Sequence, residues 1–103
     1  MVVDNNPKQS ELTRAHIWVT GRVQGVGFRA FVAYNARMIG VNGWVRNLGY
    51  GTVEAVAEGT QAQIDQFIQT VKMGPRAAHV DECRVEAETP AGEFQTFEIK
   101  SSR

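Results

Sequence analysis

Cysteine and histidine are scarce in this chain, and their scarcity limits the chemistry that it can support. Its 103 residues include one cysteine, Cys83, which excludes an internal disulfide and a cysteine-cluster metal site. The two histidines, His16 and His79, are far apart in the sequence and have no metal-ligand spacing around them. We therefore predict that the chain has no metal site and needs no cofactor.

Neither sign of charge is in excess, and no long apolar run is present. The 11 Lys and Arg residues balance the 11 Asp and Glu residues, which argues against non-specific nucleic-acid binding, because such binding usually needs a basic face. No apolar run approaches the roughly 20 residues of a membrane helix, and the N-terminus lacks a charged-then-apolar signal pattern. We expect a cytoplasmic monomer with no nucleic-acid partner and no membrane partner.

The length fits one small domain after a polar leader. Residues 1–12 are polar, contain Asn5-Asn6-Pro7 and show no periodicity, so we expect them to be disordered. Residues 13–100 form the predicted domain. Alternation predicts strands over Thr13–Thr20, Asn42–Asn47, Thr52–Glu58 and Asp81–Glu88, and a short last strand within Phe94–Ile99 whose Phe97 and Ile99 face the core. Helical spacing predicts helices over Phe28–Ile39 and from a capping box of Thr60 and Gln63 to Met73, followed by a connector over Arg76–Val80.

This order of elements repeats strand, helix, strand twice, which is typical of the α+β ferredoxin-like fold, βαββαβ. Two helices are expected on one face of an antiparallel sheet, with the first and third strands at its centre. The other face is expected to stay more open, which suits the glutamates Glu54 and Glu58 of the third strand. In this fold His16 is a strand-face residue rather than a catalytic base, and Cys83 is a small buried side chain.

A glycine-rich stretch, Gly21-Arg22-Val23-Gln24-Gly25-Val26-Gly27-Phe28-Arg29, joins the first strand to the first helix. Glycine adopts backbone angles that other residues avoid, so such a loop can turn several N–H groups toward one point and form an anion-binding nest. The helix adds its positive N-terminal end, and Arg29 adds a planar, permanently charged guanidinium. The stretch lacks the spacing of a nucleotide P-loop or of a dinucleotide fold. On its own it is as consistent with an ordinary turn as with a site for a small phosphate-like anion.

A second group of residues, Gly43-Trp44-Val45-Arg46-Asn47, ends the second predicted strand. Asparagine is no base at neutral pH, but it can hold a water molecule by donating one hydrogen bond and accepting another. In the predicted fold Asn47 comes near the mouth of the glycine loop, at a distance that the sequence leaves open. The alternative interpretation is a turn residue that precedes the glycine hairpin of Gly49 and Gly51.

At these residues the chain resembles the acylphosphatases. Their first signature is matched by residues 21–29, and their second by residues 43–53, Gly43-Trp44-Val45-Arg46-Asn47-Leu48-Gly49-Tyr50-Gly51-Thr52-Val53, followed by Gly59. The resemblance runs from about Thr13 to Lys100 and implies the ferredoxin-like fold with strand order 4-1-3-2, in agreement with the element order. Gly49-Tyr50 stands where many relatives have a polar or acidic residue, and Leu48 provides no hydroxyl beside Asn47. These departures concern the hairpin and substrate entry.

The resemblance also implies an activity. The family hydrolyses the carboxyl-phosphate anhydride of small acyl phosphates to a carboxylate and inorganic phosphate, without a metal. By position, Arg29 corresponds to the phosphate-binding arginine and Asn47 to the asparagine that orients the attacking water. The phosphate cradle corresponds to the backbone amides of Gln24, Gly25, Val26, Gly27 and Phe28. Inorganic phosphate or sulfate is then expected to compete with the substrate.

Two other functions are compatible with this fold. A non-catalytic anion-binding or regulatory domain would keep the glycine loop, and acylphosphatase-like domains also occur inside larger proteins. An RNA-binding sheet presents paired aromatics on its central strands, whereas these strands carry Trp18 together with Glu54 and Glu58. The intact pair of Arg29 and Asn47 favours the enzyme.

Overall fold

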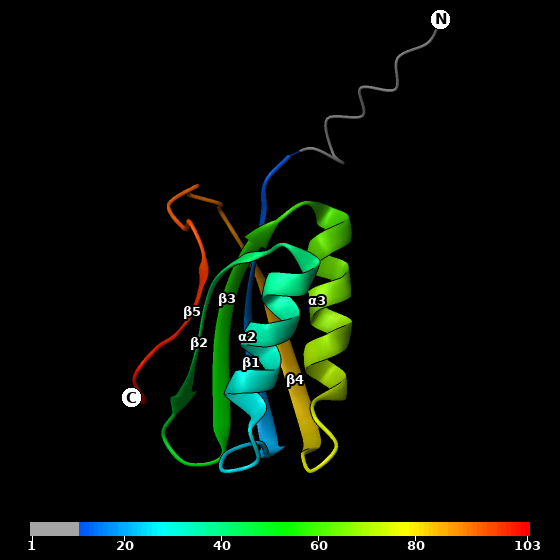
Figure 1. Ribbon diagram of the computed structural model, residues 1–103, viewed down its shortest axis with the longest axis vertical. Helices are drawn as coiled ribbons and strands as arrows, with labels where there is room; N and C mark the ends of the chain where they lie inside the picture. The colour runs from blue at the N-terminus through cyan, green and yellow to red at the C-terminus, as the bar shows by residue number, and fades with distance from the viewer. Residues whose placement is uncertain (1–10) are drawn as a thin grey trace, which may run out of the picture.

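The computed structural model describes residues 11–103, which form two helices packed on a five-stranded sheet (Figure 1). The strands are β1 (Thr13–Arg22), β2 (Asn42–Leu48), β3 (Thr52–Gly59), β4 (His79–Glu88) and β5 (Phe97–Ile99), and the helices are α2 (Phe28–Ile39) and α3 (Gln61–Met73). Residues 1–10 of the predicted leader, which spans residues 1–12, lie outside the described residues. The elements of the described chain all fall within the predicted domain of residues 13–100.

The strand order of the sheet is β4-β1-β3-β2-β5. β1 pairs with β3 and β4, and β3 pairs with β2, all in antiparallel orientation as the pattern predicted. β5 lies beyond β2 and runs parallel to it, so the predicted antiparallel sheet of order 4-1-3-2 is corrected in this detail. The pairing is parallel because the segment after β4 crosses to the far edge of the sheet before β5 begins (Figure 1).

Strand pairing extends beyond the predicted ends, furthest in β1 and β4. β1 continues to Arg22, and β4 begins at His79, within the residues expected to form a connector. The extension occurs because Gly21 and Arg22 pair with Val80 and His79 after a register shift that follows Thr20. The capping box at the start of α3 is confirmed, since Thr60 and Gln63 bond each other's backbone N–H groups.

The core lies between the two helices and the sheet face that they cover. Phe28 of α2, Phe67 of α3 and Phe97 of β5 are each at most 1% exposed. Burying such a side chain stabilises the fold by about 1.5–3 kcal/mol, which holds both helices on one face. Phe97 faces the core as predicted, but Ile99 is 46% exposed, so its predicted burial is wrong. Ile99 lies beside the first turn of α2, where the core ends at a surface cavity.

The opposite sheet face is less open than the sequence predicted. Glu58 is 3% exposed, because Arg14 on β1 bonds its carboxylate at 3.2 Å and the backbone N–H groups of Ala91 and Gly92 donate to it at 2.8 and 3.1 Å. The segment that follows β4 thus covers this end of β3. Cys83 is half-buried and packs against the edge of the core, so it is less buried than expected.

A second ionic cluster covers the middle of that face. The Nδ1 and Nε2 atoms of His16 lie 2.6 Å from Glu88 and 2.7 Å from Glu54, and Nε of Arg46 donates to Glu54 at 2.7 Å. Burial alone raises the pKa of Glu54, but the hydrogen bonds of His16 and Arg46 outweigh burial and hold that pKa below its ordinary value. The pKa of Glu88 is lowered chiefly by its hydrogen bond with His16, together with that of Arg14. His16 is therefore a strand-face residue, as predicted.

Candidate active site

Two connections that are distant in the sequence meet at one end of the sheet. The loop between β1 and α2 and the hairpin between β2 and β3 lie at the same end of the molecule (Figure 1). The side chain of Gln24 joins them, because Nε2 donates to the carbonyl oxygens of Gly49 and Thr52 at 3.1 and 2.8 Å. The glycine loop and the hairpin that follows Asn47 are therefore neighbours, which the sequence had left open.

The shape of the loop depends on two of its glycines. Gly25 and Gly27 have φ angles of +73° and +75°, a left-handed conformation that other residues rarely adopt. Gly27 precedes the first residue of α2, and no side chain caps this helix end. No carbonyl oxygen of the described backbone accepts a hydrogen bond from the N–H groups of residues 24–28. Such N–H groups at a helix N-terminus attract an anion.

Arg29 is the second residue of α2, and the first turn of that helix contains no acidic residue. The ion pairs formed within residues 11–103 involve other basic side chains: Arg14, His16, Arg46, His79 and Arg84. A cation beside the positive end of a helix is unfavourable until an anion binds there. Arg29 therefore does not stabilise this helix end by itself, and a bound anion would relieve the repulsion.

Asn47 lies on β2, opposite Val53 of β3. Its Oδ1 atom is buried and has no hydrogen-bond partner within residues 11–103. An unpaired buried acceptor costs about 1–3 kcal/mol, so natural structures seldom keep one without a function. This amide is free to hold a water molecule or a substrate atom.

A cavity of about 240 Å³ brings these groups together. It is lined by Val23, Gly25, Gly27, Phe28, Arg29, Ala30, Asn47 and Ile99. Both predicted site side chains and three of the five predicted cradle residues thus border one space. Gln24 and Val26 do not line it: Gln24 bonds the hairpin, and Val26 packs against the core. Sequence reasoning missed Ile99, because its alternation with Phe97 placed it in the core.

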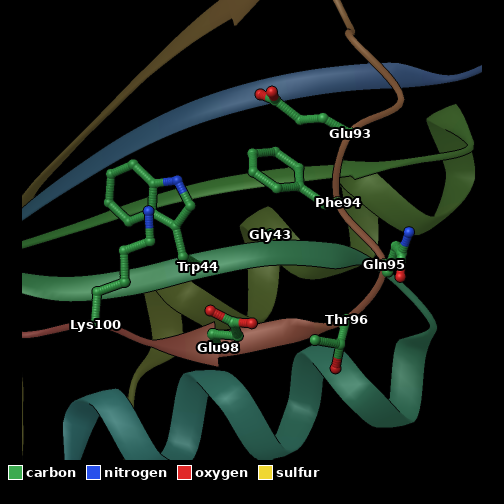
Figure 2. Close-up of a pocket in the computed structure, with 8 residues that line it drawn as sticks. All are labelled: Gly43, Trp44, Glu93, Phe94, Gln95, Thr96, Glu98 and Lys100. Atoms are coloured by element: carbon green, nitrogen blue, oxygen red, sulfur yellow. The ribbon is translucent and has the colours of Figure 1, made fainter.

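Two other cavities among the described residues contain none of the predicted site residues. One, of about 330 Å³, lies between Trp44 of β2 and the segment from Glu93 to Lys100 (Figure 2). The side chain of Lys100 lies beside the indole, with Nζ 5.0 Å from the ring centre, and Glu93 and Glu98 supply negative charge. The other, of about 370 Å³, surrounds Trp18, whose ring is covered by Arg84. Neither of these two cavities is lined by a cluster of hydrogen-bond donors that could hold an anion.

The comparisons with known proteins identify the family of this chain. Residues 15–99 match the family model of Acylphosphatase. The chain belongs to the acylphosphatase family. An acylphosphatase of Nostoc sp. (strain PCC 7120 / SAG 25.82 / UTEX 2576) is 48% identical over 96 residues, which are 93% of this chain and 94% of the relative. An acylphosphatase of Moorella thermoacetica is 50% identical over 91 residues, 88% of this chain and 97% of the relative.

The fold is shared with solved acylphosphatases. The crystal structure of acylphosphatase from Bacillus subtilis matches with a TM-score of 0.82 and 37% identity, over 87% of this chain and 99% of that one. The predicted family, ferredoxin-like fold and enzyme class are confirmed: the chain is a hydrolase with acylphosphatase activity on a small acyl phosphate. Within residues 11–103, neither helix has the length and apolar character to cross a membrane. The cytoplasmic location stays a prediction.

Proposed function

We propose that Arg29 and the backbone N–H groups of residues 24–28 bind the phosphoryl group of an acyl phosphate, while Asn47 orients the attacking water. The observation that carries this proposal is the single cavity lined by Gly25, Gly27, Arg29 and Asn47. In the reaction, the water oxygen forms a bond to phosphorus as the bond from phosphorus to the acyl oxygen breaks. The products are a carboxylate, inorganic phosphate and a proton released to solvent.

The phosphoryl end of the substrate needs donors more than it needs covalent chemistry. Phosphoryl transfer depends on positioning and on stabilising charge over the three outer oxygens. Arg29 offers a planar fork of N–H donors, and the left-handed Gly25 and Gly27 shape the loop that carries the backbone donors. Since these groups are in place before substrate binds, they need no reorganisation in the transition state.

The side chain of Asn47 is suited to positioning water. Its unpaired Oδ1 can accept a hydrogen bond from water, and the same amide offers N–H donors. A water molecule held by Asn47 and by the bound phosphate has a restricted orientation, which lowers the entropic part of the barrier. The amide of Asn47 is not basic at neutral pH, so Asn47 orients the water molecule without removing its proton.

The nature of the leaving group makes a metal ion and a strong general base unnecessary. A carboxylic acid has a low pKa, so the carboxylate departs with the electron pair of the P–O bond without prior protonation. For this reason we expect the reaction to proceed without a metal ion and without a strong general base. The recognised part of the substrate is then mainly its phosphoryl end, so inorganic phosphate and sulfate should compete for the same donors.

Hydrolysis of benzoyl phosphate by the purified full chain, with and without a chelator, tests this proposal. We expect equal turnover in both conditions and competitive inhibition by inorganic phosphate. Loss of turnover on chelation would contradict the metal-free mechanism. A folded protein that binds phosphate but hydrolyses no acyl phosphate would instead support a non-catalytic anion-binding domain.

A further inference from the structure

One large, exposed apolar side chain lies in the wall of the cavity that Arg29 lines. Ile99, the last residue of β5, is 46% exposed and borders this cavity. The other large apolar side chains of the wall, Val23 and Phe28, are each 1% exposed and belong to the core. Ile99 is therefore the main apolar surface that the cavity can offer to a ligand.

The position of Ile99 is set by the strand that carries Asn47. Ile99 is the register partner of Val45 in the parallel pairing of β5 with β2. On the far side of Ile99, the N–H of Lys100 donates to the carbonyl oxygen of Val45 at 2.8 Å, and the N–H of Arg103 donates to that of Asn47 at 2.9 Å. These backbone bonds hold the apolar wall and the proposed water-orienting amide on one rigid frame.

An acyl phosphate has two chemically different ends. The phosphoryl end needs hydrogen-bond donors, and an isoleucine side chain offers none. The acyl end carries the apolar surface of the substrate, which gains free energy when it leaves water for contact with another apolar surface. The cavity likewise has donors on the loop and Arg29, and an apolar wall at Ile99.

We propose, on the basis of the function proposed above, that Ile99 contacts the acyl group and sets a preference for acyl phosphates with a bulky apolar acyl group. An aromatic or branched acyl group covers the exposed part of Ile99, whereas the methyl group of acetyl phosphate covers little of it. The phosphate donors serve every acyl phosphate equally. Selectivity among substrates therefore arises from Ile99 rather than from Arg29.

The test is the ratio of kcat/KM for benzoyl phosphate to kcat/KM for acetyl phosphate. A methylene in a hydrophobic pocket changes kcat/KM by about 10- to 200-fold, and a half-exposed wall yields a smaller effect. We expect Ile99→Ala to lower the ratio by about 3- to 10-fold, mainly through a higher KM for benzoyl phosphate. The ratio cancels general effects on the phosphate donors and on the amount of folded enzyme.

Two variants serve as matched controls. Glu98→Ala changes the neighbouring residue of β5, whose side chain belongs to the cavity on the opposite sheet face, near Trp44 and Lys100 (Figure 2). Tyr34→Ala removes an exposed aromatic residue of α2, which does not line the cavity at Arg29. Both should keep the wild-type ratio.

An unchanged ratio in Ile99→Ala, or an equal fall in both substrates, overturns the acyl contact and leaves the proposed function intact. If Ile99→Ala does not fold, Ile99→Thr keeps a β-branched strand residue with a more polar surface, and it must lower the ratio in the same direction. Wild-type protein that hydrolyses neither substrate overturns the proposed function, and this inference with it.

Discussion

The Nε2 atom of Gln24 donates to the carbonyl oxygen of Thr52 at 2.8 Å and so links the glycine-rich loop to the β2–β3 hairpin. The same atom donates to the carbonyl oxygen of Gly49 at 3.1 Å. The loop carries the proposed phosphate donors, and the hairpin begins just after Asn47. One side chain therefore helps to set the spacing between the two halves of the proposed site.

Gln24→Met should weaken both stability and turnover. Methionine is similar in length but donates no hydrogen bond, so the free energy of unfolding should fall by about 1–2 kcal/mol, since each bond contributes roughly 0.5–1.5 kcal/mol. We expect kcat to fall more than KM rises, because the loop and the hairpin lose their fixed spacing. Urea unfolding and steady-state kinetics measure the two effects. Gln69→Met, at an exposed position of α3, is the control. If the Gln24→Met variant is less stable but keeps wild-type kcat, Gln24 has a structural role alone.

Arg29→Ala should raise KM and nearly abolish turnover. Loss of one preorganised donor typically costs about 2.7–4 kcal/mol, or roughly 100- to 1,000-fold in rate. Stability should not fall, because the variant removes a positive charge from the positive end of α2. Kinetics and a thermal melt, with exposed Arg76→Ala as the control, separate the two effects. Near-wild-type kcat/KM in Arg29→Ala would exclude Arg29 from phosphate binding.

Asn47→Ala should reduce kcat and leave KM close to the wild-type value. The substitution removes the groups that orient water but none of the loop donors. It also removes a buried oxygen that has no partner within the described chain, so it should cost little stability. Asn42→Ala, on the same strand, is the control and should keep wild-type kcat. A raised KM with unchanged kcat would contradict the water-orienting role.

Acid should destabilise the fold through the cluster around His16. The pKa values of Glu54 and Glu88 are held below their ordinary 4.5, so ionisation of these carboxylates favours the folded state above that pH. This contribution is lost as the pH falls through the lowered folded-state pKa values. Urea unfolding between pH 7 and pH 3 should show stability falling below about pH 4.5. Glu54→Gln should be less stable at pH 7 and lose part of the acid slope, whereas exposed Glu86→Gln should retain it.

Patterns within short segments were sufficient to predict much of the fold and to propose residues of the candidate site. Alternation and helical spacing predicted the strands and both helices, and Thr60 and Gln63 predicted the start of α3. Such features depend on neighbours a few residues away, and the sequence displays these neighbours directly. Arg29 and Asn47 were proposed as site residues in the same way, because glycine turns and family motifs are contiguous in the chain.

The remaining features required the three-dimensional arrangement. The sheet face that carries Glu54 was expected to stay more open, yet Arg46 and His16 from neighbouring strands cover this carboxylate. The alternation of β5 placed Ile99 in the core, but this edge strand brings Ile99 to the first turn of α2 and into the cavity wall. Each of these outcomes depends on which distant segment packs against a residue. Period-two alternation states which face a side chain occupies, while the segments packed on that face decide whether it is buried, paired with a charge or exposed to a substrate.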